Sequence, residues 1–428
     1  MYCGGCLRDN ALVAALRKVG HDVTMVPLYL PLTLEDEDQS SDTPIFFTGI
    51  NVYLQQKTHF FRHAPKWMHR WLASPRLLRW AAGRAGQTRP EDLGELTVSM
   101  LKGEQGNQTR ELDALIDWLK PQERPDVICL SNALLLGLVW QLKAELNVPV
   151  ICSLQGEDSF LDSLPAGSRE IAWETARDRA GEVDLFIAPS RYFGQRMAKQ
   201  LNISPEKMKV VYNGIDLDGF EISNLNNEKP PTLGFFARMC KEKGLDTLVD
   251  AFIELRRRNR VPHLKLKIGG SCGPGDEKFV AQQRKKIGAA NLSRAVEFHP
   301  NLSRAAKIEF LKSLSLFSAP ATYGEAFGLY VIEALAAGVP VVQPRHGAFP
   351  ELVEATGGGV LCEANDVHAL ADAMEKLLLD PARTRALGAD GHQAVVANFS
   401  AERMARQMGE VYAEVAARFS IANLKSKI

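Results

Sequence analysis

Short apolar runs alternate with longer amphipathic stretches along the first half of the chain. The apolar runs predict strands, while stretches with apolar residues at helical spacing, such as 109–119 and 135–146, predict helices between them. This alternation indicates a parallel sheet that is covered by helices. The expected strands cover residues 21–27, 126–131, 148–154, 185–188 and 209–212.

The same alternation starts again after residues 224–231, a polar segment that ends in two prolines and that we interpret as a linker. We expect a first domain over 1–223, a second over 232–399, and a last helix, about 401–417, capped by Ser400. Two parallel-sheet domains in succession predict a ligand cleft at the carboxyl ends of their strands. In the second domain the expected strands are 232–236, 264–268, 296–299, 316–320 and 339–343, and the helices are 245–258, 278–287, 305–314, 330–337 and 367–379.

Residues 35–100 interrupt the first series with an acidic run and a tract rich in Arg, Trp and His. We interpret this insertion as a solvent-exposed helical segment. The alternative is a surface that binds a second substrate or touches a membrane.

The chain opens with a glycine-rich segment, 2–6, that leads into an amphipathic stretch, 10–19. A glycine loop that feeds a helix ordinarily follows the first strand of a doubly wound domain, and no strand pattern precedes this one. We therefore hypothesise that the natural first strand is missing, through a misplaced start or a trimmed sequence. Cys3 and Cys6 also match C-x-x-C, but no second ligand pair accompanies them, so a loop that approaches a ligand is favoured over redox or zinc chemistry.

Charge and composition argue against several classes of protein. Lys and Arg number 51, as do Asp and Glu, and this zero formal net charge argues against general nucleic-acid binding. At 46% hydrophobic residues the chain is too apolar for disorder, yet no apolar run approaches the roughly 20 residues of a membrane span. Because the seven cysteines are mostly scattered and no signal-peptide pattern is seen, we expect a cytoplasmic protein with reduced thiols.

The segment 321–340 carries two glutamates on a predicted strand–loop–helix unit. The helix begins near Gly328 and Leu329, where its free amide groups suit a diphosphate. Glu333 in that helix can accept hydrogen bonds from two ribose hydroxyls, and Glu325 in the loop can accept them from a sugar. Glutamates near a helix start also serve as caps and surface charges, so this pair alone leaves the choice open.

Two cations follow the first strand of the second domain, Arg238 and Lys243. They lie at the strand's carboxyl end, where positive charge would stabilise a departing nucleoside diphosphate. The alternative is a solvated basic turn, which is the stronger interpretation for Lys241. Further along the chain, a glycine turn, Gly269-Gly270, ends the predicted strand 264–268.

Arg238 with Lys243-Gly244, together with Glu325-x₇-Glu333, resembles the motifs of the retaining glycosyltransferases of family 4. Members have the GT-B architecture, two Rossmann-like parallel-sheet domains facing a central cleft. The resemblance extends over nearly the whole chain, since 20–23 and 213–216 also match.

The resemblance implies that Arg238 and Lys243 hold the donor diphosphate, with Glu325 on the transferred sugar, and we name these three as catalytic. It also implies that Gly4 and Gly5 lie near the diphosphate, that residues 400–428 pack back on the first domain, and that no metal or other cofactor is needed. The predicted donor-binding residues are Gly5, Gly270, Phe327, Gly328, Leu329 and Glu333.

The chain departs from the family where many relatives carry a histidine near the reacting sugar, because Gln155 stands there. Glutamine can hydrogen-bond a sugar hydroxyl but cannot shuttle a proton. Glu157, Asp158 or the leaving phosphate could accept the acceptor's proton, although two acids at a helix start are equally typical of a structural charge pair. We predict Gln155 and Asp158 only as pocket residues.

The leading hypothesis is a retaining transferase that moves a sugar from a nucleotide-diphosphate sugar to a glycan, lipid or small molecule. Its expected partners are that donor and a carbohydrate or lipid-linked acceptor, with peripheral membrane contact left open. One alternative is a nucleotide-sugar epimerase or hydrolase of the same fold, which would not need an acceptor site; the insertion at 35–100 favours transfer over it. The other is a catalytically lapsed nucleotide-sugar-binding protein, which Gln155 and the missing strand keep open.

Overall fold

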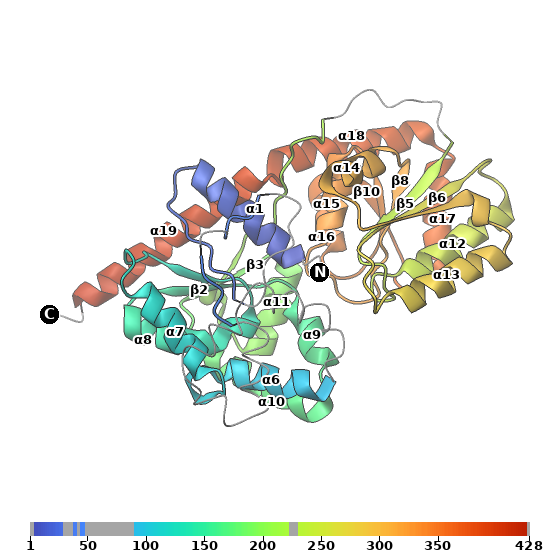
Figure 1. The fold of residues 1–428 in the computed structure, drawn as a ribbon. Coiled ribbons are helices and arrows are strands. Elements are labelled where there is room, and N and C mark those ends of the chain that lie inside the picture. The colour runs from blue at the N-terminus through green and yellow to red at the C-terminus, as the bar shows by residue number, and fades with distance from the viewer. Residues whose placement is uncertain (1–3, 29–36, 41–42, 48–89, 222–229, 426–428) are drawn as a thin grey trace. The chain divides into compact units, whose positions relative to one another are not determined.

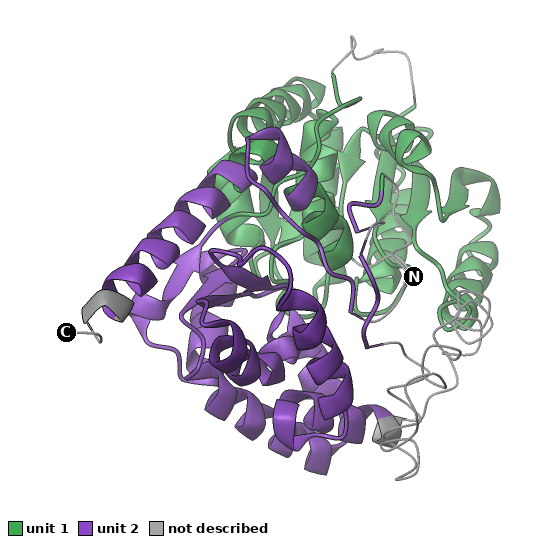
Figure 2. Cartoon of the chain, turned by 60° about the vertical axis from the view of Figure 1, so that its left-hand side comes forward, with its two compact units in different colours: residues 1–12, 34–37, 212–404 green, residues 13–33, 38–211, 405–428 purple. Residues whose placement is uncertain are grey.

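The computed structural model describes residues 4–28, 37–40, 43–47, 90–221 and 230–425. The chain divides into two compact units, coloured separately in Figure 2. Unit 1 comprises residues 1–12, 34–37 and 212–404, and unit 2 comprises residues 13–33, 38–211 and 405–428. Most of the insertion expected at 35–100 and of the linker expected at 224–231 falls outside the described residues, as does Cys3.

Unit 2 contains a parallel sheet in the order β1-β2-β3-β4, and Figure 1 labels its central strands, β2 and β3. The strands are β1 (Ile128–Leu130), β2 (Val150–Ser153), β3 (Leu185–Ala188) and β4 (Met208–Val210). The central strands β2 and β3 are buried along their whole length, as expected for a parallel sheet with helices on both faces. The helices that begin in this part of the sequence are α6 (Pro90–Leu101), α7 (Thr109–Leu119), α8 (Val139–Leu146), α9 (Glu157–Ser163), α10 (Ala166–Ala180) and α11 (Arg191–Leu201).

The strand expected at 21–27 is wrong, because residues 21–28 form no strand. Side chains take up backbone carbonyls that a sheet partner would otherwise bind. The guanidinium of Arg17 donates to the carbonyl of Val23 through Nε at 3.0 Å and Nη2 at 2.8 Å. Thr43 donates through its hydroxyl to the carbonyl of Met25 at 2.7 Å. Among the residues that the structure describes, this strand-like apolar pattern has no neighbouring strand to pair with.

Unit 1 contains a second parallel sheet, in the order β10-β9-β8-β5-β6-β7. Both sheets confirm the expected α/β class, and the strands and helices expected over 232–379 are present. The strands are β5 (Thr232–Phe236), β6 (Lys265–Gly270), β7 (Val296–Pro300), β8 (Leu316–Phe317), β9 (Val341–Pro344) and β10 (Gly359–Cys362). The helices are α12 (Leu245–Arg258), α13 (Glu277–Ala289), α14 (Arg304–Lys312), α15 (Leu329–Ala336), α16 (Phe349–Thr356), α17 (Val367–Leu378) and α18 (Pro381–Asn398).

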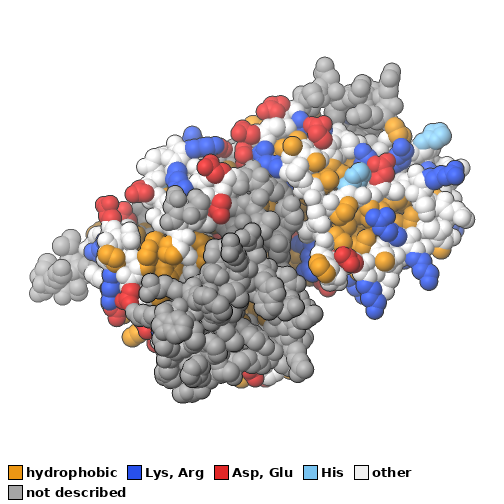
Figure 3. Space-filling view, in the orientation of Figure 1, with side chains coloured by type: hydrophobic (Ala, Val, Ile, Leu, Met, Phe, Trp, Pro, Cys, Tyr) orange, Lys and Arg blue, Asp and Glu red, His pale blue; other side chains and the backbone are white. Residues whose placement is uncertain are grey.

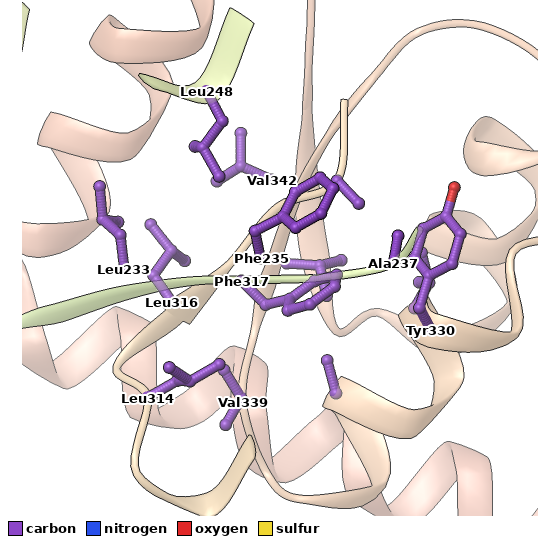
Figure 4. Close-up of a cluster of buried hydrophobic side chains, with 14 of the residues drawn as sticks. Leu233, Phe235, Ala237, Leu248, Leu314, Leu316, Phe317, Tyr330, Val339 and Val342 are labelled. Atoms are coloured by element: carbon purple, nitrogen blue, oxygen red, sulfur yellow. The ribbon is translucent and has the colours of Figure 1, made fainter. Parts of the chain in front are cut away.

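The core of unit 1 is built around the middle of its sheet (Figure 4). Phe235 of β5 and Phe317 of β8 are fully buried and lie next to each other among aliphatic side chains such as Leu248 and Val342. Tyr330 of α15 borders this cluster near Ala237, and its hydroxyl points away from the aliphatic side chains. Burying aromatic side chains of this size provides a large share of a domain's hydrophobic stabilisation, and it anchors the strand ends that carry the loops described below.

Two further helices include residues of both units. Helix α1 (Gly4–Lys18) starts the described chain, and α19 (Ala401–Lys425) ends it. The predicted cap is confirmed, since the hydroxyl of Ser400 accepts a hydrogen bond from the backbone of Arg403 at 3.1 Å. Among the described helices, none is both long and apolar enough to cross a membrane. Charged side chains of both signs are spread over the visible faces of the two units (Figure 3).

Candidate functional site

The predicted second-domain residues come together at one edge of the sheet of unit 1. Strands β5 and β8 are parallel neighbours, so the loops that follow their carboxyl ends lie side by side. A backbone hydrogen bond of 2.9 Å from Thr322 to Glu242 joins these two loops. Sequence reasoning placed Lys243 and Glu325 on separate loops, and the strand order brings them into contact.

Lys243, Tyr323, Glu325 and Tyr330 form a compact cluster, named here the carboxylate cluster. Lys243 Nζ lies 2.5 Å from Glu325 Oε2 and 2.5 Å from the hydroxyl of Tyr323. The hydroxyls of Tyr330 and Tyr323 donate to the same Oε2 at 2.7 and 3.2 Å. Nζ also lies 5.0 Å from the ring centre of Tyr323 and 5.2 Å from that of Tyr330, where a cation is attracted to an aromatic ring.

The cluster keeps its lysine and its glutamate charged. Burial by itself would raise the pKa of Glu325, but the charge and hydrogen bond of Lys243 and the two phenols bring that pKa below its usual value. Burial opposes the charge on Lys243, yet Glu325 and Tyr323 raise the pKa of this lysine above its usual value. Burial and the nearby carboxylate raise the pKa of Tyr330, so that its hydroxyl stays a neutral donor.

Arg238 lies at the end of β5 with 62% of its side chain exposed. Its Nε is 3.1 and 3.2 Å from the two carboxylate oxygens of Asp276, and its Nη2 is 2.9 Å from Oδ1. Asp276 is itself buried and accepts a backbone hydrogen bond from Gly273 at 3.1 Å. One edge of the guanidinium is therefore held by a fixed carboxylate while much of the side chain faces solvent.

Glu333 lies in the second turn of α15 and is paired with a buried lysine. Its Oε1 is 2.9 Å from Lys307 Nζ of α14, and the Lys307 side chain is only 8% exposed. Lys307 thus holds one oxygen of the carboxylate that we predict to bind ribose.

The start of α15 has the backbone geometry that a helix entry requires. Gly328 has φ of +95°, in the left-handed region that disfavours other residues, and Leu329 begins the helix. A Cβ on Gly4, in the first turn of α1, would lie 3.9 Å from the Leu329 side chain, so the start of α1 reaches this point. Gly5 is the next residue of that helix, and its place in the donor site stays a prediction. Phe327 is buried, with its ring centre 6.2 Å from that of Tyr212.

Gly270 ends β6 and allows a close backbone approach. Its φ is +119°, and a Cβ there would lie 1.9 Å from the carbonyl oxygen of Ala237, just before Arg238. No larger residue fits without moving the loop that carries Arg238.

The predicted pocket residues Gln155 and Asp158 belong to unit 2. Asp158 is buried and forms an ion pair with Arg196. Gln155 Nε2 is buried, and no described residue accepts a hydrogen bond from it. Both assignments stay predictions.

Glu157 has a structural task that the sequence did not distinguish from catalysis. It accepts backbone hydrogen bonds from Ala133 at 2.6 Å, Gln155 at 2.6 Å and Gly156 at 2.7 Å. Burial raises the pKa of Glu157 despite these bonds. This carboxylate therefore ties the end of β2 to the segment after β1.

Sequence reasoning missed four side chains of the site: Asp276, Lys307, Tyr323 and Tyr330. An aspartate before a helix resembles an ordinary cap, a lysine in a helix resembles a surface residue, and a tyrosine in a loop or a helix resembles a core or surface residue, so no local signal marks them. Within the described part of the chain, no three His, Cys, Asp or Glu side chains are grouped as metal ligands would be. The expectation that no metal is needed stays a prediction.

Comparisons with known proteins agree with this arrangement. The family model described as "Glycosyl transferases group 1" matches residues 220–394, and the one described as "Glycosyltransferase Family 4" matches residues 98–218. The chain is 32% identical over 219 residues to a lipopolysaccharide core biosynthesis mannosyltransferase, LpsB, of Rhizobium meliloti, covering 47% of this chain and 60% of the relative. It is 30% identical over 270 residues to a D-inositol 3-phosphate glycosyltransferase of Corynebacterium jeikeium, covering 59% and 62%.

The fold is also that of solved GT-B structures. The structure of Anabaena Alr3699/HepE in complex with UDP matches with a TM-score of 0.62 at 20% identity, covering 73% of this chain and 84% of that one. The chain spans about three fifths of the length of the two curated relatives named above, LpsB (60%) and the D-inositol 3-phosphate glycosyltransferase (62%). From the two family models that match in succession, and from the two parallel-sheet units, the chain belongs to the group 1 glycosyltransferases, of the family 4 type.

Proposed function

We propose that the chain transfers a sugar, with retention at the anomeric carbon, from a nucleoside-diphosphate sugar to a hydroxyl of an acceptor. The observation that carries this proposal is the contact of Lys243 with Glu325 at the ends of two adjacent strands, beside the start of α15. This arrangement offers a cation for a diphosphate and a carboxylate for sugar hydroxyls a few ångströms apart.

In the proposed reaction the bond between the anomeric carbon and the diphosphate oxygen breaks, and its electron pair stays on that oxygen. A new bond forms between the anomeric carbon and the acceptor oxygen, on the same face of the sugar. The acceptor's proton passes to the leaving diphosphate, because Gln155 cannot take it. Arg238, Lys243 and the amides at the start of α15 stabilise the charge that develops on the leaving group.

Glu325 accepts hydrogen bonds from the transferred sugar, and Glu333 accepts them from the ribose. Both roles are supported by ion pairs within unit 1, because Glu325 is paired with Lys243 and Glu333 with Lys307. No metal enters this proposal. Gly5, Gly270, Phe327, Gly328 and Leu329 shape the donor site through backbone and packing.

For the acceptor, we propose a carbohydrate or lipid-linked molecule. The names of the relatives support this class, since one is a lipopolysaccharide core mannosyltransferase and another a D-inositol 3-phosphate glycosyltransferase. We also propose that residues 1–223 form the acceptor domain, with Gln155 and Asp158 in its pocket, and that 232–399 form the donor domain with 400–428 returning to the first.

The test is calorimetric binding of UDP, GDP and ADP, followed by hydrolysis and transfer assays with UDP-glucose, GDP-mannose and ADP-glucose. We expect one nucleotide to bind and its sugar to be slowly hydrolysed, with the anomeric configuration kept when proton NMR follows the reaction. Lys243→Ala should lower turnover at least about a hundredfold, since it removes a cation from the leaving group.

Lys241→Ala is the matched control, because Lys241 is an exposed lysine of the same loop. Absence of binding by all three nucleotides would refute the proposal. Equal losses in the two lysine variants would refute the assignment of Lys243.

A further inference from the structure

The hydrogen bonds to the Glu325 carboxylate all fall on one of its two oxygens. Lys243 Nζ, the Tyr330 hydroxyl and the Tyr323 hydroxyl donate to Oε2 at 2.5, 2.7 and 3.2 Å. The hydrogen bonds that described residues donate to this side chain leave Oε1 without a donor, and the side chain is only 11% exposed. Oε1 therefore keeps its acceptor capacity for a ligand.

The three donors come from separate segments, which fixes the carboxylate in direction as well as in place. Lys243 comes from the loop after β5, Tyr323 from the loop after β8, and Tyr330 from the first turn of α15. An ion pair with one flexible lysine would let the carboxylate rotate, whereas two further donors on rigid segments define its plane.

Tyr330 is the more rigidly held of the two phenols. Its ring centre lies 6.2 Å from that of Phe317 and 6.4 Å from that of Phe349, inside the core of unit 1. Figure 4 shows its hydroxyl directed away from the aliphatic cluster. The core thus fixes the ring, and the ring fixes the hydroxyl that holds Glu325.

Tyr323 links the lysine to the carboxylate. It accepts from Lys243 Nζ at 2.5 Å and donates to Glu325 Oε2. Its hydroxyl therefore keeps Lys243, the proposed diphosphate-binding cation, in a fixed orientation relative to Glu325, the proposed sugar-binding carboxylate.

We propose that Tyr330 and Tyr323 are positioning residues that turn the Glu325 carboxylate so that Oε1 is the oxygen offered to the transferred sugar. This inference rests on the proposed function, in which Glu325 binds that sugar. The tyrosines act through Glu325 and touch no substrate. Their role is to remove the cost of orienting the carboxylate during the reaction.

The electrostatics of the cluster support this role. Both phenols contribute to the lowered pKa of Glu325, after burial and Lys243. The titratable groups around the carboxylate are Lys243, Tyr323 and Tyr330, and Cys240 lies near Tyr330. The loop between β9 and α16 packs against Glu325 through the backbone, with Ala348 donating to the Glu325 carbonyl at 2.9 Å. Without a phenol hydroxyl, the pKa of Glu325 moves upward.

The experiment measures kcat, KM and their pH dependence in the full chain for Tyr330→Phe, Tyr323→Phe and the double variant. Each change keeps the ring and removes one hydroxyl. With the donor that wild type hydrolyses, we expect kcat to fall about tenfold in Tyr330→Phe, the loss typical of one hydrogen bond to a charged group, with the donor KM within about twofold. The acid limb of kcat/KM against pH should move to higher pH, and the double variant should lose more.

Tyr212→Phe is the matched control. Tyr212 also belongs to unit 1, and its hydroxyl donates to another buried glutamate, Glu351, at 2.8 Å. A merely structural role of the phenols would lower the melting temperature in all three single variants without moving the acid limb. If Tyr330→Phe does not fold, Tyr323→Phe carries the same test, because its side chain is less buried.

The experiment distinguishes failure of the proposed function from failure of the positioning role. If wild type turns over none of the three donors, or Glu325→Gln keeps full activity, the proposed function fails and this inference falls with it. If Glu325→Gln abolishes turnover but both Tyr→Phe variants keep wild-type kcat and acid limb, the proposed function stands and the positioning role is refuted.

Discussion

Replacing Lys243 by methionine should destabilise unit 1 in a way that depends on pH. The side chains of Lys243 and Glu325 are only 20% and 11% exposed, so the change leaves a buried carboxylate without its cation. Removing one partner of a buried ion pair costs about 3–5 kcal/mol. We expect about 3 kcal/mol for Lys243→Met, because the two tyrosine hydroxyls still donate to Glu325 and because the carboxylate can take up a proton.

The pH dependence follows from the direction of the pKa of Glu325. In the wild type this pKa is lowered, so the stabilisation is complete above the pKa of the unfolded carboxyl and is lost as pH falls through the folded value. In Lys243→Met the charge and hydrogen bond of the lysine are gone while burial, the largest influence on this carboxyl, remains, so we expect the pKa of Glu325 to lie above its unfolded value. Its stability is then intact below the unfolded pKa and is lost as pH rises through the folded value. The difference in free energy of unfolding between the two proteins therefore increases from pH 5 to pH 8.

The assay is urea denaturation followed by far-UV circular dichroism at both pH values. All six tryptophans fall between residues 67 and 173, in the unit 2 part of the sequence, so tryptophan fluorescence follows unit 2 in the same samples. The matched control is Lys286→Met, because Lys286 pairs with Asp250 at 2.8 Å with side chains 39% and 41% exposed. An exposed pair of this kind contributes at most about 1 kcal/mol.

A loss in Lys243→Met no larger than that in the control would refute the reasoning. The same holds for a loss that is equal at pH 5 and pH 8, since Glu325 would then not titrate as a buried, unpaired acid.

Two further changes test the site and its support. Asp276→Asn frees Arg238 from its carboxylate. The calorimetric Kd for the bound nucleoside diphosphate should rise about threefold to tenfold, because binding must then order one long side chain. A lower Kd would instead mean that Asp276 competes with the phosphate. Glu157→Gln places an amide donor against backbone donors and should lower the stability of unit 2 by about 1–3 kcal/mol, read as a lower urea midpoint of tryptophan fluorescence. An unchanged midpoint would contradict the structural task of Glu157.

The sequence by itself determined the local elements of the second domain. Apolar periodicity placed β5, β6, β7 and β9 within about a residue or two, because buried parallel strands are short apolar runs whatever their neighbours are. The Glu325-x₇-Glu333 spacing placed one carboxylate in a loop and one in a helix, since Gly328 allows the helix to begin between them. The same reasoning failed at 21–27, where no strand of the described part of the chain pairs with the strand pattern.

Only the tertiary structure decided which side chains meet. Strand β5 lies between β6 and β8, although β8 follows 80 residues later in the chain, and this order brings Lys243 to Glu325 and Arg238 to Asp276. Strand order depends on how helices cover the sheet, and no local pattern encodes it. For the same reason Tyr330 could not be recognised from its spacing as a partner of Glu325. A buried tyrosine in a helix is ordinary until the fold shows which carboxylate its hydroxyl contacts.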